Sequence, residues 1–307
     1  MSQVQTVQGP VEEDALGVVL AHEHVRFRDE AVAVEWPARY DEQLEFDAAL
    51  VAVQAAKHEG VRTIVDPTAM FGGRDVRFMK RVADETGVQI VACTGIYSYD
   101  YLPHYFENRD ADVMADHFVE DIEIGIQGTE IRAGFLKCAA DAAGVTENVE
   151  KIHRAIARAS LQTGAPIMAH SMPAVATGPR QVEIFEEEGV DLAKVQLAHC
   201  GDTDDVDYIE ALLGRGVYVG LDRYGLEMFL PIDRRNATAG IECAMIGAPV
   251  RTLARATARW IFSTCSVIPA ASAAHFRNAA LMPVPWIPRS MSATKWSAIT
   301  STSRFSK

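Results

Sequence analysis

The stretch Leu20-Ala21-His22-Glu23-His24-Val25 decides the fold of this chain. It follows Gly17-Val18-Val19, so an apolar run ends in His-x-His, and that pattern predicts a buried strand with two histidines at its carboxyl end. Because side chains alternate along a strand, His22 and His24 are expected on one face, about 6.5–7 Å apart. Two imidazoles at this spacing can bind one metal ion. The simpler interpretation is that the two histidines end a strand and bind no metal. Three later strands that also end in a potential ligand argue against it.

Apolar segments and helical segments alternate along most of the chain. Further strands are predicted at 61–67, 88–95, 133–138, 166–170, 194–199 and 217–222. Helices are predicted at 43–59, 74–86, 112–126, 147–163, 179–188, and from an N-cap at Thr203 to about Leu213. Seven β-then-α units with short connections predict a parallel sheet closed as a (β/α)8 TIM barrel. An open doubly wound sheet is the alternative, but it would normally carry a glycine-rich phosphate turn where this chain has histidines.

Two segments lie outside these units. Residues 3–11 alternate weakly and contain Gly9-Pro10, which indicates a small hairpin that covers the bottom of the barrel. Residues 29–42 carry Trp36-Pro37 and several charges, and we expect them to form a loop.

Composition and charge limit the classes of partner. The 307 residues have a formal charge of −13 and a pI near 5.1, which argues against nucleic acid or an anionic membrane surface. No apolar run is long enough to span a membrane, and the start of the chain lacks the pattern of a secretory signal. The cysteines form no Cys-x-x-Cys pair, so free thiols in a reducing cytoplasm are expected: Cys93, Cys138, Cys200, Cys243 and Cys265. Homodimerisation stays open.

Three later strands also end in a potential metal ligand. The fourth, fifth and sixth predicted strands end with Lys137, His170 and His199. All strand carboxyl ends of a barrel open on one face, so these side chains and the His-x-His pair are expected around one centre. Strand alternation turns their neighbours Glu23, Cys138 and Cys200 toward the helix layer, where thiols pack rather than bind metal.

Lys137 is the unusual member of this set. A protonated lysine would be repelled by metal ions, but a lysine that reacts with carbon dioxide becomes a carbamate, an anionic oxygen donor able to bridge two ions. A lysine that lies along the barrel rim with its ammonium group in water is the alternative. The four histidines that flank Lys137 in strand order favour the carbamate.

These motifs resemble the phosphotriesterase family of the amidohydrolase superfamily, and most closely its phosphotriesterase-like lactonases. The resemblance runs from about Val4 to Asn236. It rests on Gly17-x-x-Leu20-Ala21-His22-Glu23-His24, Ala133-Gly134-Phe135-Leu136-Lys137-Cys138, Ala169-His170, Ala198-His199-Cys200-Gly201-Asp202 and Gly220-Leu221-Asp222-Arg223-Tyr224-Gly225. It implies a metal-dependent hydrolase that opens lactones, acyl-homoserine lactones in particular (quorum quenching), and that cleaves organophosphate triesters more slowly.

The resemblance also implies a binuclear metal centre. His22 and His24 would hold the more buried ion, and His170 and His199 the more exposed one. Carboxylated Lys137 and a hydroxide would bridge the two. Zinc is the expected metal, with iron, cobalt and manganese as alternatives, and the acidified water would attack an ester carbonyl or a phosphorus centre.

Two further residues match the substrate-contacting pair of the lactonases. Tyr97 follows the third predicted strand, and Arg223 follows the seventh. The resemblance therefore implies that both side chains contact the lactone or phosphotriester beside the metal ions.

The chain departs from the family after its seventh strand. The family has an aspartate at the end of strand 8, in a Ser-His-Asp stretch, that binds the buried ion and shuttles a proton. The corresponding region, Val250 to Ile261, contains no acidic residue. Asp222 does not obviously replace this aspartate, because the lactonases have both, and Asp233 lies in the expected helix after strand 7. The catalytic proton acceptor is therefore not identified, and the loop after strand 8 that shapes the lactone pocket is unrecognisable.

Composition changes at the same place. All 42 acidic residues lie at or before Glu242, whereas the remaining segment contains eight lysines and arginines. We therefore divide the chain into a hydrolase barrel with strands 1–7 at 1–240 and an atypical segment at 241–307. We interpret that segment as a loss of the native reading frame, by a frameshift in the gene or in the sequence as read. A basic, loosely ordered native tail is the alternative.

Three other interpretations of the chain stay open. Another amidohydrolase, such as a deaminase or a metal-dependent nuclease, would tend to have a glutamate or no bridging ligand where Lys137 stands. A metal-binding barrel without turnover, or a chain too damaged to fold, would follow from the missing strand-8 aspartate.

Overall fold

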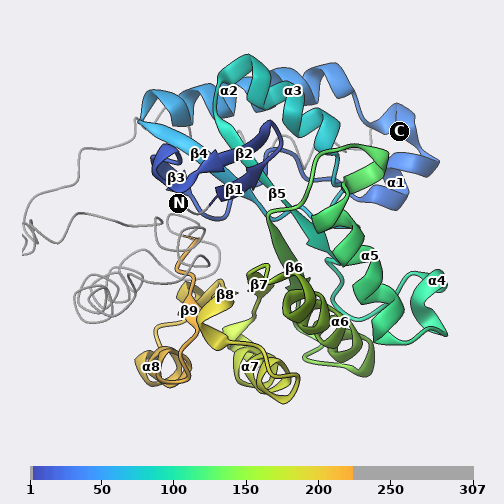
Figure 1. The fold of residues 1–307 in the computed structure, drawn as a ribbon, viewed down its shortest axis with the longest axis vertical. Helices are drawn as coiled ribbons and strands as arrows, with labels where there is room; N and C mark the ends of the chain where they lie inside the picture. The colour runs from blue at the N-terminus through green and yellow to red at the C-terminus, as the bar shows by residue number, and fades with distance from the viewer. Residues whose placement is uncertain (1–2, 224–307) are drawn as a thin grey trace, which may run out of the picture. The chain divides into compact units, whose positions relative to one another are not determined.

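The computed structural model describes residues 3–223. Its centre is a curled sheet of seven parallel strands, each paired with the next along the chain (Figure 1). In order these are β3 (Val18–Leu20), β4 (Val61–Asp66), β5 (Gln89–Gly95), β6 (Phe135–Ala139), β7 (Ile167–His170), β8 (Val195–Ala198) and β9 (Tyr218–Val219). A doubly wound sheet would reverse its strand order at a switch point, whereas this order runs in one direction. The fold is therefore of the (β/α)8-barrel type, as predicted; its expected eighth strand falls outside the described residues.

A helix follows each of the first six strands and packs against the sheet or a neighbouring helix (Figure 1). These helices are α2 (Glu42–His58), α3 (Val76–Thr86), α5 (Ala111–Glu123), α6 (Glu147–Thr163), α7 (Thr177–Glu187) and α8 (Val206–Gly214). Short 3-10 helices join some elements: η1 (Glu13–Ala15), η2 (Pro37–Arg39), η3 (Ile126–Gly128), η4 (Pro173–Val175), η5 (Leu192–Lys194) and η6 (Cys200–Asp202). Within residues 3–223, no helix is long and apolar enough to cross a membrane.

The predicted N-terminal hairpin is confirmed. Strands β1 (Gln3–Thr6) and β2 (Gly9–Glu12) pair antiparallel. The backbone N–H of Val7 donates to the carbonyl oxygen of Ile90, near the amino end of β5, at 2.8 Å. Val4 and Val7 are buried. The hairpin therefore covers the amino ends of the strands and leaves their carboxyl ends to the site.

Local sequence explains where the main helices begin and end. The Asp41 carboxylate caps α2 by accepting from two backbone N–H groups, and the Thr146 hydroxyl caps α6 by accepting from Val149. Helices α3 and α6 end at Gly87 and Gly164, which have positive φ angles of 66° and 76°. Both helices end where the sequence predicted, at residues 86 and 163.

Two local predictions are wrong, and one short helix was not predicted. Residues 29–42 are not all loop, because the Asp29 carboxylate accepts from Val32 and caps a short helix, α1 (Glu30–Glu35). The small helix α4 (His104–Glu107) was not expected. Helix α8 is capped by Asp205 rather than Thr203, since the Asp205 carboxylate accepts from Tyr208 while the Thr203 hydroxyl accepts from the N–H of Asp205.

Alternation along each strand divides the core between two faces of the sheet. Phe135 of β6 is fully buried on the inner face, with Val4 of the hairpin. Cys138 of β6 points the other way and packs with Ile152 of α6, and Cys200 lies in the same outer cluster. Burial raises the pKa of both thiols to about 12. The prediction that these cysteines pack against the helix layer is confirmed.

A buried histidine links α6 and α7 to the sheet. The Nδ1–H of His153 donates to the Val149 carbonyl at 2.7 Å, so its Nε2 accepts from the Gln181 amide at 2.9 Å. The same amide group donates to the carbonyl of His170 at the end of β7. The His153 side chain is fully buried, and burial lowers its pKa to about 4.

This histidine should make the folded state sensitive to acid. Between pH 6.5 and pH 4 the unfolded chain binds a proton at His153 that the folded chain does not, so the free energy of unfolding falls as the pH falls. We expect a loss of about 2 kcal/mol from this group at pH 5. Urea unfolding at pH 7.5 and pH 5 should show a smaller pH effect in His153→Gln than in the unmutated chain. The exposed His58→Asn is the matched control, and an unchanged pH effect in His153→Gln would contradict the assignment.

Candidate metal centre

The two histidines of the opening motif lie just beyond strand β3. Pairing of β3 with β4 ends at Leu20, and the chain then continues as a loop whose Glu23 N–H donates to the Val65 carbonyl at 3.2 Å. The prediction that His22 and His24 are strand residues is therefore wrong, and Glu23 is exposed instead of facing the helices. The two rings nevertheless lie side by side, with centroids 5.7 Å apart.

Four imidazoles meet at the carboxyl edge of the sheet. His170 is the last residue of β7, and His199 follows β8 with a left-handed φ of 66°. The ring centroids of His22 and His199 are 4.7 Å apart, and those of His199 and His170 are 4.5 Å apart. His24, His22, His199 and His170 thus form one row of rings, as the strand-end argument predicted.

Burial keeps these rings neutral. It lowers the pKa of His22, it lowers the pKa values of His24 and His199 well below the ordinary value, and it lowers that of His170 to about 4. A neutral imidazole has one nitrogen with a free lone pair, which is the form that binds a metal ion.

Lys137 lies in β6 with its side chain fully buried. Among the described residues, no group forms a hydrogen bond with its Nζ atom, which lies 5.9 Å from the ring centroid of Tyr97. An unpaired buried amine is costly, so this atom calls for a partner. Burial also lowers its pKa to about 8, which raises the fraction of neutral amine, the form that reacts with carbon dioxide. The orphaned amine and the neutral imidazoles fit a metal centre with a carboxylated lysine.

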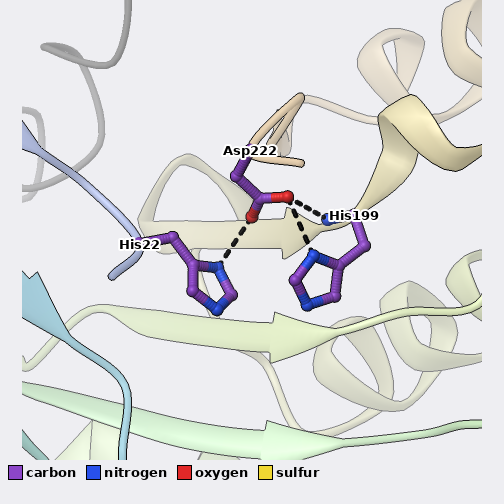
Figure 2. Close-up of side chains that lie close together, drawn as sticks. All are labelled: His22, His199 and Asp222. Carbon is purple, nitrogen blue, oxygen red and sulfur yellow. Dashed lines mark hydrogen bonds and ion pairs between the residues drawn. The ribbon is translucent and has the colours of Figure 1, made fainter. Parts of the chain in front are cut away.

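Asp222 also belongs to the site. Its Oδ2 atom lies 2.7 Å from Nδ1 of His22, and its Oδ1 atom lies 2.9 Å from Nδ1 of His199 (Figure 2). The three side chains offer donor atoms within 4.8 Å of one another. Burial alone would raise the pKa of Asp222, but the interactions with the N–H groups of His22 and His199 lower it well below its usual value. Sequence reasoning quoted this residue and set it aside.

Two more partners of the histidines escaped sequence reasoning. The Thr68 hydroxyl lies 2.6 Å from Nδ1 of His24, and the Asp141 carboxylate lies 3.1 Å from Nε2 of His170. Thr68 follows β4 and Asp141 follows β6, so the rule that strand carboxyl ends face the site could have found both.

Tyr97 and Arg223 lie at the same edge. The Tyr97 hydroxyl is 3.2 Å from Nδ1 of His170 and 2.7 Å from the hydroxyl of Tyr99. The Arg223 guanidinium donates to the Asp202 carboxylate at 2.5 Å. Both residues follow a strand of the sheet, β5 and β9. Their contact with substrate stays a prediction.

A family model described as "Phosphotriesterase family" matches residues 2–244. The chain belongs to the phosphotriesterase family. An aryldialkylphosphatase of Saccharolobus solfataricus is 50% identical over 228 residues, which cover 74% of this chain and 73% of that protein. A phosphotriesterase homology protein of Mycobacterium tuberculosis is 42% identical over 248 residues, covering 78% and 76%. The solved structure of the phosphotriesterase from Mycobacterium tuberculosis is similar with a TM-score of 0.76 at 40% identity, covering 80% of this chain and 79% of that chain.

Membership of the phosphotriesterase family fixes the class of chemistry. The family is one of metal-dependent hydrolases, and its phosphotriesterase homologues act on ester bonds. The cluster at the carboxyl edge of this sheet is a candidate site for that metal.

Close packing between β5 and β6 sets the position of Lys137. Gly95 of β5 pairs with Lys137 and has a φ of 132°, and a Cβ atom added there would lie 1.9 Å from the Lys137 carbonyl oxygen. Only glycine fits this approach without moving one of the two strands.

We therefore expect Gly95→Ala to reduce the free energy of unfolding by about 2–5 kcal/mol, because it combines backbone strain with a clash. Gly214→Ala is the matched control: a Cβ there has no neighbour within 4 Å, at the end of α8. It should be neutral or slightly stabilising. Chemical denaturation of the two variants measures the difference, and equal stabilities would contradict the packing argument.

Proposed function

We propose that this chain is a metal-dependent hydrolase that opens lactones, with acyl-homoserine lactones as the preferred class and organophosphate triesters as slower substrates. The observation that carries this proposal is the buried, unpartnered amine of Lys137 beside the row of four histidines. The lactone preference rests on the match of the sequence motifs to the lactonases. The phosphotriester activity is supported by the name of the archaeal relative, an aryldialkylphosphatase.

Each ligand group has a proposed place. His22 and His24 would hold one divalent ion, His170 and His199 would hold the second, and a carbamate on Lys137 would supply an oxygen donor for both. Zinc is the proposed metal, since imidazole nitrogens and a carboxylate-like oxygen suit it, with iron, cobalt and manganese as alternatives. The bound ions would lower the pKa of a water molecule and polarise the carbonyl or phosphoryl oxygen under attack.

The protein groups around this centre position the substrate. The Tyr97 hydroxyl lies 3.2 Å from Nδ1 of His170. When this contact breaks, the hydroxyl can donate a hydrogen bond to an ester oxygen of the substrate. The Asp202 carboxylate holds the Arg223 guanidinium in place. Arg223 in turn is proposed to orient the lactone ring.

A second candidate, a metal-binding barrel with impaired turnover, is favoured by the sequence after Glu242. The expected proton-accepting aspartate of strand 8 has no counterpart there. We retain the proposal that 1–240 forms the hydrolase barrel and that 241–307 reflects a lost reading frame. The family match, which ends at residue 244, supports that division. A reducing cytoplasmic location is supported by free, buried Cys93, Cys138 and Cys200.

Lys137 gives a direct test of the metal centre. Purified protein refolded with zinc and bicarbonate should hold about two ions per chain. Lys137→Ala should lose metal and activity because the bridging oxygen donor is removed, and short carboxylates added in solution should restore part of both. Metal analysis and lactone ring opening measure these effects.

The controls separate the carbamate from a simple charge effect. Exposed Lys80→Ala on α3 should keep both ions. Lys137→Arg should lose metal, because a guanidinium cannot form a carbamate. Full metal content in Lys137→Arg would exclude a carboxylated lysine, and one ion or none in the unmutated chain would exclude the binuclear site.

The atypical segment at 241–307 gives the second test. General acid–base help is worth about 10²–10⁴-fold in rate, so a chain without the strand-8 aspartate should open lactones at least about a hundredfold more slowly than one with the frame restored after about residue 240. The chain as written should also be less soluble, because an open sheet edge favours association. The two forms should be expressed side by side and their ring-opening rates compared. Equal rates would show that the aspartate is dispensable or replaced.

A further inference from the structure

Asp222 is the one described side chain that hydrogen-bonds to two of the proposed metal ligands. Each carboxylate oxygen serves one ring: Oδ2 lies 2.7 Å from Nδ1 of His22, and Oδ1 lies 2.9 Å from Nδ1 of His199. Oδ1 also accepts from the backbone N–H of His199 at 2.9 Å. Asp222 is therefore fixed from three directions, and its side chain is only 2% exposed.

The chemistry of these contacts determines the tautomer of both rings. An ionised carboxylate only accepts hydrogen bonds, so each Nδ1 atom must carry the hydrogen. A neutral imidazole has one N–H group, which leaves Nε2 of each ring with its lone pair free. Among the described residues, no hydrogen bond involves Nε2 of His22 or His199. Figure 2 shows both Nε2 atoms on the side of the rings that faces away from the carboxylate.

We propose that Asp222 is a positioning residue of the metal centre, which holds Nδ1–H of His22 and of His199 so that both rings present Nε2 to metal. The inference rests on the proposed function, because it assumes that these rings are ligands. It deepens that function by naming the group that selects the ligating atoms. Carboxylates that orient metal-binding imidazoles in this way typically raise metal affinity 10–100-fold.

Direct ligation by Asp222 is the competing arrangement. It would have to use the lone pair of Oδ2 that the three hydrogen bonds leave, or displace one of these bonds and leave a buried N–H without an acceptor, which is costly. The other two histidines are held differently: His24 contacts the Thr68 hydroxyl, and both ring nitrogens of His170 contact protein groups. Asp222 thus contacts one proposed ligand of each ion, His22 for one and His199 for the other.

This shared contact predicts a coupled loss of metal. Asp222→Ala should weaken both ions, each by about 10–100-fold, because one ligand of each ion loses its orientation. A direct ligand would weaken mainly the ion it binds. Zinc titration of the full-length chain, followed by metal analysis and competition with a chromogenic chelator, separates the two cases.

The tautomers are read directly by NMR of the full-length, metal-free chain with ¹⁵N-labelled histidine. We expect the Nδ1–H form at His22 and His199. Asp222→Asn keeps the size of the side chain but has one acceptor oxygen and one donor nitrogen, so only the ring that faces the oxygen should keep the Nδ1–H form. The matched control is Asp141→Asn, because Asp141 contacts no ring of the histidine row other than His170, so the variant should leave His22 and His199 unchanged.

Several outcomes would overturn the inference: the Nε2–H form at either ring of the unmutated chain, no tautomer change in Asp222→Asn, or loss of a single ion in Asp222→Ala. If the unmutated chain binds no zinc, the proposed function fails, and the tautomers of the metal-free chain still decide whether Asp222 orients the rings. Thermal melting of each variant checks that it folds, and the near-isosteric Asp222→Asn decides the matter if Asp222→Ala does not.

Discussion

Parallel pairing in chain order is the constraint on which the site depends. Lys137 of β6 pairs with Gly95 of β5 on one side and with Met168 of β7 on the other, and His170 of β7 pairs with Ala198 of β8. Each strand therefore delivers its last side chains to the same edge. The hairpin covers the opposite ends, so the apolar core lies between the hairpin and the edge that carries the histidines. A slip of one residue in any of these registers would turn Lys137 or His170 toward the helices.

Burial then determines the chemistry of the edge. Desolvation disfavours charge, so the four imidazoles are neutral and the Lys137 amine is neutral more often than a lysine in water. Asp222 stays ionised in the same environment because two rings and a backbone N–H donate to it. The result is a cluster of lone pairs beside the ionised carboxylates of Asp222 and Asp141, an environment that attracts a divalent cation.

The sequence predicted the fold and the gathering of the histidines because both follow from periodicity. Apolar runs of strand length and strand-end histidines are local signals, and they placed His170 and His199 at the edge where the rings meet, whereas Lys137 lies inside β6, two residues before its end. Metal binding by these residues stays a prediction. Local signals failed for His22 and His24, which leave the strand early where the Glu23 N–H contacts Val65 of β4. They also did not separate Thr203 from Asp205 as the cap of α8, because both side chains accept from a nearby backbone N–H. Asp222 was set aside because its partner His22 lies 200 residues away, a distance that no local pattern spans. For the segment after residue 240, the sequence showed only missing features: acidic residues after Glu242 and the expected strand-8 aspartate.

The His22–Asp222 contact joins the segments that follow β3 and β9, the first and last strands of the described sheet. Contacts between residues so far apart in sequence carry a large loop-closure entropy and form late in folding. The histidine row would then be complete only after the intervening strands have assembled, and a partly folded chain would offer metal ions a weaker, two-histidine site. Metal binding would favour the fully assembled sheet, because ions that bind only the complete site stabilise the folded state by mass action. A change in the chain near Asp222 would then affect assembly and metal binding together, because this residue makes the contact with His22.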